Sequence, residues 1–280
     1  MIVTLLAGAI AMALPQQQID TSFAVRAGGE LSLEAIDGSV TIGTWDRAAM
    51  RIRANHRGRS EIEIRHRGNE VSIEAEQAGM ADPVTFEITV PRSYSIVVEG
   101  VNVPITVVGV QGNVSIENVA GAISIRSVTG ELDIESVSGS ISVEDHNGNM
   151  TVATVNEAIR ITGGRSVIEA ETVNGSILIR SVDAANVEAS TVNGIVEYHG
   201  TIRDRGRYFL ATHNGQITIA IPEQTNATVV VDAENGRVET AFPVRITRGR
   251  SHTFTLGSGS ASIELESYNG TINLVRPRAR

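Results

Sequence analysis

The chain has 280 residues, of which 27 are glycine, 4% are aromatic, 20% are charged and none is cysteine. The lack of cysteine excludes disulfides, thiolate zinc sites, iron–sulfur clusters and cysteine nucleophiles. A formal net charge of −9 argues against a general nucleic-acid-binding protein, which needs a basic surface. The hydrophobic fraction of 41% is typical of a folded chain, and no apolar run is long enough to span a bilayer.

The first segment has the pattern of a signal peptide. Residues 2–14 are apolar or small, and the first charged residue is Asp20. Ala11-Met12-Ala13 is a small-x-small site of the kind that signal peptidase cleaves, so we expect a signal peptide over residues 1–13. No arginine precedes the apolar run, and a buried first strand is the alternative. We therefore expect an exported protein, located in the periplasm, on the outer surface or outside the cell.

Residues 20–90 contain several short alternations of apolar and polar side chains, which are typical of half-buried strands. The runs are 31–36, 39–43, 51–54, 61–65, 70–76 and 85–90, with a joint at 77–83. An open end of a stacked-strand fold would expose unpaired strand edges. We expect this segment to be a strand-rich N-terminal cap or the first coils of such a fold.

A nine-residue repeat organises the middle of the chain. Its glycines are Gly112, Gly121, Gly130, Gly139 and Gly148. The positions two and four residues after each glycine are aliphatic or methionine, as in Val114 and Ile116, whereas the positions between and beside them are polar or small. Because side chains alternate along a strand, each unit predicts one short strand with an apolar inner face. The sixth position is small and polar, which favours a corner where its side chain satisfies backbone amides.

One such strand cannot bury its inner face alone, so the units must stack. Later glycines are 19 to 21 residues apart, from Gly175 to Gly236, and each interval holds two strand-like runs. The sequence therefore predicts an all-β fold over residues 91–275, a single-layer parallel β-solenoid (β-helix) with coils of about 18–21 residues. Since parallel crossovers are overwhelmingly right-handed, we expect a right-handed winding.

Asn-Gly dipeptides leave a rival architecture open. They occur six times, at Asn147, Asn174, Asn193, Asn214, Asn235 and Asn269, and Asn-Gly favours two-residue hairpins. A meander or barrel of antiparallel strands would follow. The scarcity of aromatic residues and the short strands argue against a membrane barrel. Residues 276–280 form a charged tail that would block edge pairing, with a basic ligand-binding tail as the alternative.

The frame Val-x-Gly-x-Ile-x-Ile-x-Ser recurs over residues 110–118, 119–127, 128–136 and 137–145. It resembles the bacterial "putative adhesin" family of β-strand repeats, whose function is unknown, over roughly residues 30–275. The run 84–90, Pro91, then 95–99 looks like that family's lead-in to its repeats. The resemblance implies an exported, elongated β-helical protein and offers no catalytic residues. Glu157 and His146 depart from the pattern.

No standard catalytic or phosphate-binding motif is present, and no catalytic, cofactor-binding or metal-binding residue is assigned. Three clusters are candidates for a site. The first cluster is basic and consists of Arg51, Arg53, Arg57, Arg59, Arg65 and Arg67, with His56 and His66. It could bind anionic polymers, or it could be a hairpin whose outward arginines face Glu61 and Glu63. The second, 203–207 with Tyr198 and His199, could serve a polysaccharide lyase or hydrolase, or be a self-paired loop. The third is the outward row of the repeats, where Glu117 would stack on Glu135 and Arg126 on Glu144.

The favoured function is a non-catalytic, adhesin-like or structural interaction protein of the cell envelope without a cofactor. Its partner would be a cell-surface or envelope component, either polysaccharide or protein. The alternative is a polysaccharide-active lyase or hydrolase on a β-helical scaffold. A third hypothesis is a periplasmic regulatory or assembly partner.

Overall fold

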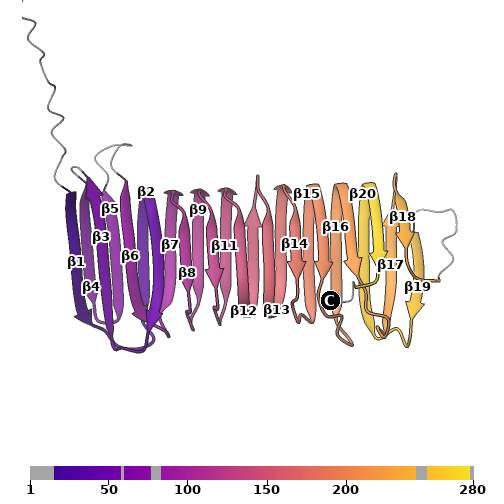
Figure 1. Ribbon diagram of the computed structural model, residues 1–280, viewed down its shortest axis with the longest axis horizontal. Coiled ribbons are helices and arrows are strands. Elements are labelled where there is room, and N and C mark those ends of the chain that lie inside the picture. Colours follow the sequence, from indigo (N-terminus) through magenta and orange to yellow (C-terminus); the bar gives the residue numbers. More distant parts are fainter. Residues whose placement is uncertain (1–15, 58–59, 77–82, 244–250, 278–280) are drawn as a thin grey trace, which may run out of the picture.

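The computed structural model describes residues 16–57, 60–76, 83–243 and 251–277, and within these ranges the chain is all β. Twenty strands form one continuous sheet, and the molecule is elongated at right angles to them (Figure 1). None of the described residues belongs to a helix that is long and apolar enough to cross a membrane. The predicted signal peptide, residues 1–13, lies outside the described residues.

The strands of the N-terminal half are β1 (Gln16–Ala24), β2 (Glu30–Trp45), β3 (Ala49–Arg57), β4 (Glu61–Arg67), β5 (Glu70–Glu76), β6 (Val84–Pro91), β7 (Ser95–Asn102), β8 (Ile105–Val108), β9 (Val114–Ala120), β10 (Ile123–Arg126) and β11 (Leu132–Ser138). Those of the C-terminal half are β12 (Ile141–Thr154), β13 (Ile159–Asn174), β14 (Ile177–Arg180), β15 (Asn186–His199), β16 (Arg207–Ala220), β17 (Ala227–Ala233), β18 (Arg237–Thr240), β19 (Ser251–Leu256) and β20 (Ala261–Val275).

The repeat region is a parallel stack of coils, as the nine-residue frame predicts. Ile123 pairs with Ile105 on one side and with Ile141 on the other, in each case 18 residues away along the chain. After β13 the coil lengthens to 19 and then 21 residues, because Ile168 pairs with Val187 and Val187 with Tyr208. The expectation of parallel coils of about 18–21 residues is therefore confirmed, and the direction of winding stays a prediction.

The inward columns are aliphatic, also as predicted. Ile134 is fully buried and lies in register between Ile116 and Val152, which are buried as well. Each coil thus packs its side chains on those of the coils above and below. Burying an aliphatic side chain of this size stabilises the fold by about 1.5–3 kcal/mol. The stack of these columns is the hydrophobic core.

The hairpin interpretation of the Asn-Gly dipeptides is wrong. Asn147 and Gly148 lie inside β12 and pair in parallel with β13. Four of the Asn-Gly asparagines, together with Asn156, instead form a ladder at one corner of the coils, in which each side-chain amide after the first donates to the asparagine of the neighbouring coil at 2.9–3.1 Å. Its members are Asn156, Asn174, Asn193, Asn214 and Asn269. Identical amides can form this ladder only when the coils are parallel and in register.

Both ends of the stack depart from chain order. β2 lies between β5 and β6 on one side and β7 and β8 on the other. β20 lies between β16 and the pair β17 and β18 (Figure 1). Antiparallel strands then finish each end: β1, β3 and β4 at the N-terminal end, and β19 at the other. Arg276, in the predicted solvated tail, pairs with Glu223 at 2.6 Å, whereas residues 278–280 lie outside the described residues.

Candidate functional site

The two corners of a coil place the same repeat position on opposite sides of the backbone. At one corner the sixth position has φ between 54° and 79°, the left-handed region that favours glycine and small polar residues. These residues are Gly109, Ser127, Asp145, Gly163 and Ser181. Because this conformation reverses the alternation, the residue that follows it is buried, as at Val128 and His146. The repeat therefore has an 18-residue structural period.

At the other corner the alternation continues, and the sixth position points inward. The hydroxyl groups of Thr154, Thr172 and Thr191 donate to the carbonyl oxygens of Gly139, Glu157 and Gly175 at 3.0–3.4 Å. The expected role of the sixth position needs correction here, since it satisfies corner carbonyls rather than amides. The residue after it, which is usually valine, points to the solvent.

These outward residues form a continuous apolar ridge along the stack, which we call the valine ridge. Their exposed fractions are 39–49%, and successive members sit on neighbouring coils. The ridge consists of Ile36, Val101, Val119, Val137, Val155, Val173 and Val192. Single exposed apolar residues are ordinary, but a contiguous row of them is typical of an interaction surface.

A column of carboxylates runs beside the ridge, which we call the glutamate wall. Parallel registers stack Glu74 on Glu34, Glu34 on Glu99, Glu99 on Glu117 and Glu117 on Glu135. The predicted stacking of Glu117 on Glu135 is therefore confirmed. Ala153 interrupts the wall, and Glu171 continues it before Ser190. Like charges in directly opposed positions destabilise a sheet.

The glutamate wall and the valine ridge enclose a groove of about 1050 Å³ that runs along the stack. Its floor is the row of inward-turned small residues, including Asn118, Ser136 and Thr154, which are 4–6% exposed. Coils from β5 to β15 contribute to the lining, so the groove crosses most of the described length of the stack. Its surface is apolar on one side and acidic on the other.

The groove wall differs from the opposite face of the same coils. There the predicted stacking of Arg126 on Glu144 is confirmed, with a 3.3 Å ion pair, and Arg180 pairs with Glu197 at 3.0 Å. In the groove, by contrast, Arg65 pairs with Glu74 at 2.5 Å at one end only. Within the described ranges, no ion pair is formed by Glu34, Glu99, Glu117, Glu135 or Glu171.

Beyond Val192 the ridge ends in an aromatic pair. The rings of His213 and Tyr268 stack with centroids 4.6 Å apart and planes 4° from parallel. A smaller hollow of about 320 Å³ at this end is lined by both rings and by carboxylates that include Asp232 and Glu266. Burial raises the pKa of Glu266, and the neighbouring carboxylates of Glu264 and Asp232 raise it further. This end therefore combines a cluster of carboxyl groups with a Tyr268 side chain that is 42% exposed, which suits a cationic group.

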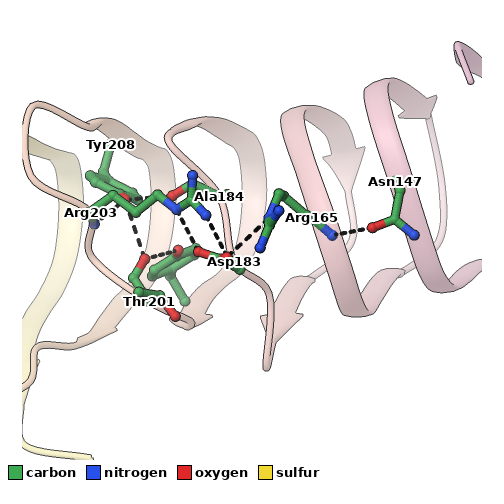
Figure 2. Close-up of polar contacts among 8 residues, drawn as sticks. Asn147, Arg165, Asp183, Ala184, Thr201, Arg203 and Tyr208 are labelled. Atoms are coloured by element: carbon green, nitrogen blue, oxygen red, sulfur yellow. Dashed lines mark hydrogen bonds and ion pairs between the residues drawn. The ribbon is translucent and has the colours of Figure 1, made fainter. Parts of the chain in front are cut away.

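The loop 203–207, the best enzyme candidate in the sequence, is held by residues outside it rather than paired with itself, since Arg203 binds Asp183 of the neighbouring coil (Figure 2). Arg203 donates two hydrogen bonds of 2.5 Å to Asp183, and Arg165 donates a third at 3.2 Å, so the pKa of Asp183 is held below its usual range. Asp204 accepts a 2.6 Å hydrogen bond from Ser260. The one carboxylate of the loop, Asp204, and its first arginine, Arg203, are therefore both engaged with neighbouring segments.

The other candidates near this loop lie on different sides of the sheet. Tyr198 is fully buried, and its hydroxyl donates to the carbonyl of Thr201 at 2.8 Å. Burial raises its pKa far above the usual value, so it stays neutral. His199 is on the outward face, 3.8 Å from Glu197. The structure therefore does not bring Tyr198 and His199 together at a site.

The N-terminal arginine cluster is also ion-paired, but not in the predicted hairpin. Arg51 pairs with Asp20 at 2.7 Å, and Arg53 with Glu87 at 3.2 Å, across β1 and β6. Arg65 pairs with Glu63 at 2.6 Å on its own strand, as well as with Glu74. Arg59 lies outside the described residues. Among the described residues, no group of three or more His, Asp or Glu side chains is placed to hold a metal ion.

The sequence contains the ridge residues, but the nine-residue repeat by itself does not tell which side they occupy. Val119 and Val128 hold the same repeat position, yet Val119 is 47% exposed and Val128 is fully buried. One signal in the sequence separates them. Glycine replaces the small polar residue at Gly109 and Gly163, in the column that adopts the left-handed conformation. Reading the repeat in 18-residue units would have exposed this difference.

Comparison with known proteins finds one family model that matches most of the chain. Residues 29–275 match the family described as Toastrack DUF4097. No curated protein matches the chain. A solved structure described as a "putative adhesin" from Bacteroides fragilis is 13% identical, covers 92% of this chain and 97% of its own, and has a TM-score of 0.38. A "putative lipid binding protein" from Parabacteroides distasonis is 12% identical with the same coverages and a TM-score of 0.48. Likenesses this distant carry no conclusion about function.

Proposed function

The chain belongs to the Toastrack DUF4097 family, and we propose that it is an exported interaction protein of the bacterial cell envelope, adhesin-like and without a catalytic role. The apolar segment 2–14 and the small-x-small site at Ala11-Met12-Ala13 support export. On this proposal the protein acts in the periplasm, on the outer surface or outside the cell, and its partner is another envelope component.

The groove between the valine ridge and the glutamate wall carries the proposal. A ridge of seven aliphatic side chains, each at least 39% exposed, keeps a large apolar surface in contact with water, which is unfavourable and promotes aggregation when no partner is bound. A partner that covers the ridge would remove this apolar surface from water. The groove extends over many coils, which suits contact with an elongated partner rather than enclosure of one small molecule.

Site-specific photocrosslinking in the native host tests the proposal. A photoreactive residue at Val137, on the ridge, should capture an envelope component, whereas the same residue at Ser142, which faces outward on β12, should not. Cell fractionation of the same strain should find the protein outside the cytoplasm. Cytoplasmic retention, or equal labelling from both positions, would overturn the proposed function.

A further inference from the structure

The groove also restricts the chemistry of the partner. We propose that it binds an amphipathic α-helix of a partner protein, whose apolar face packs on the valine ridge and whose basic flank lies along the glutamate wall. This inference rests on the proposed function, since it names the partner class of the same groove. It follows from the direction of the groove, from its length and from its charge.

The direction favours a helix over an extended peptide. The groove runs along the stack, at right angles to the strands that form its floor. The backbone groups of those strands are engaged in pairing between coils, as Ile134 and its neighbours are in β9, β11 and β12. An extended peptide in the groove would find no strand edge to pair with, and its own backbone groups would lose water without replacement. A helix satisfies its backbone internally and avoids this loss.

The length of the groove fits a helix of ordinary size. From Glu74 to Ser190 the parallel registers make seven steps between neighbouring strands, which at about 4.8 Å each give about 34 Å. At 1.5 Å per residue, a helix of about 22 residues spans this distance. One stripe of aliphatic residues at i, i+3, i+4 and i+7 would follow the whole ridge.

The charge selects a basic partner. Glu99, Glu117 and Glu135 are stacked on consecutive coils and form no ion pair with any other described residue. Arginine or lysine side chains on successive turns of a helix, about 5.4 Å apart, come close to this spacing, and long side chains absorb the difference. The same carboxylates repel an anionic membrane surface, which argues against lipid headgroups as the occupant.

Beyond the groove, the aromatic end offers a second cation site. Tyr268 is 42% exposed and stacked on His213, and Asp232 and Glu266 lie in the adjoining hollow. An arginine there can place its guanidinium over the Tyr268 ring while a carboxylate accepts its hydrogen bonds. The hollow lies two register steps beyond Ser190, about 10 Å, so a partner helix longer by about six residues would place its basic end there.

Binding of designed 22-residue peptides to the full chain, followed by fluorescence anisotropy at low and moderate salt, tests the inference. The first peptide has a leucine stripe and an arginine flank. The second replaces the arginines with glutamate, and the third replaces the leucines with glutamine. A fourth carries a central proline that breaks the helix at a cost of about 3 kcal/mol. Only the first should bind saturably, with at least a tenfold weaker affinity for each of the others, and it should become helical on binding.

Protein variants then place the binding in the groove. Glu117→Gln/Glu135→Gln should weaken binding of the first peptide about tenfold and reduce its salt dependence. Val119→Ser/Val137→Ser should weaken it at least tenfold through lost apolar contact. The matched control, Glu169→Gln/Glu188→Gln, removes two stacked charges outside the groove and should leave the affinity unchanged.

Three outcomes would overturn the inference. They are equal binding of the glutamate-flanked peptide, undiminished binding of the proline peptide, and stronger binding to phosphatidylglycerol vesicles than to any peptide. If no peptide binds while the crosslink from Val137 still captures an envelope component, the helix is wrong and the proposed function stands. If the crosslink also captures nothing, both are wrong.

Discussion

Replacing Gly194 with alanine adds one methyl group between two coils and so tests how closely the coils are stacked. Gly194 comes directly after Asn193, a member of the asparagine ladder, and pairs with Gly215 in the next coil. A Cβ at this position would overlap the carbonyl oxygen of Gly175 and lie 2.7 Å from its carbonyl carbon, closer than the 3.0 Å that real Cβ atoms respect. The obstacle is backbone held by the parallel pairing of the stack, so it cannot rotate away.

The loss of stability expected for Gly194→Ala can be worked out from the backbone contacts that must break. To make room, the coils containing Gly175 and Gly194 must move apart locally, which breaks two to three backbone hydrogen bonds worth about 1 kcal/mol each. We therefore expect the free energy of unfolding to fall by about 3 kcal/mol and Tm by about 6–12 °C for a chain of this size. Because each coil contacts only its neighbours, the unfolding transition should also lose cooperativity.

Gly43→Ala is the matched control for this experiment. Gly43 lies in β2, and a Cβ there meets nothing within 4 Å. Alanine should therefore change stability by less than about 0.5 kcal/mol, or raise it slightly by restricting the unfolded chain. Urea unfolding followed by far-ultraviolet circular dichroism measures both variants. Equal stability of the two would refute the reasoning, since it would mean that the coils tolerate a methyl group between them.

Three further predictions concern charge and burial. Burial lowers the pKa of His146, so its contribution to stability is complete above the unfolded pKa of about 6.5 and is lost as the pH falls through the folded value. Replacing His146 with valine, the usual residue of the repeat, should flatten this pH dependence of the free energy of unfolding, whose slope is at most about 1.4 kcal/mol per pH unit. Parallel profiles of unfolding free energy against pH for the two proteins would contradict the prediction. Ile134→Asp should cost several kcal/mol, whereas Ser142→Asp, which faces outward, should stay within about 0.5 kcal/mol in the same urea titration. Glu117→Gln/Glu135→Gln should stabilise the isolated protein by a few tenths of a kcal/mol at low salt, and the gain should vanish in about 1 M NaCl; a loss of stability at low salt would show that the wall supports the fold.

The columns of the core could be predicted because they depend on a local rule. Alternation along a strand fixes that Ile116 and Ile134 share a side, and the nine-residue spacing fixes that the units stack. The stacking of Glu117 on Glu135 follows from the same two facts, and it is confirmed. This part of the glutamate wall could therefore be predicted from the sequence alone.

The position of the ridge is harder to predict, because it depends on the backbone conformation at the corners, which only Gly109 and Gly163 mark in the sequence. Ser127 and Ser136 are the same residue at the same repeat position, but only Ser127 has a positive φ, of 54°. The residue type alone therefore does not determine which of the two conformations is adopted. The Asn-Gly dipeptides were ambiguous for a related reason, since an asparagine before glycine suits a tight turn as well as a ladder.

The order of the ends could not be predicted either. β20 pairs with β16 although about 40 residues separate them in the chain, because β17 to β19 lie between. Partner choice over such distances depends on which edges remain free once the rest of the stack has formed, and no short pattern records this. The same holds for β2, which is inserted before β7 and after β6 in space.

The late arrival of β20 has a consequence for biosynthesis. During synthesis β16 is made well before β20, so the flank of β16 that pairs with β20 stays open until β20 has been added. A chain terminated near residue 260 would keep that flank available to any other strand, including those of its siblings. β20 therefore joins the two parts of this end of the stack, and we expect chains that lack it to aggregate or to be degraded more readily than the full chain.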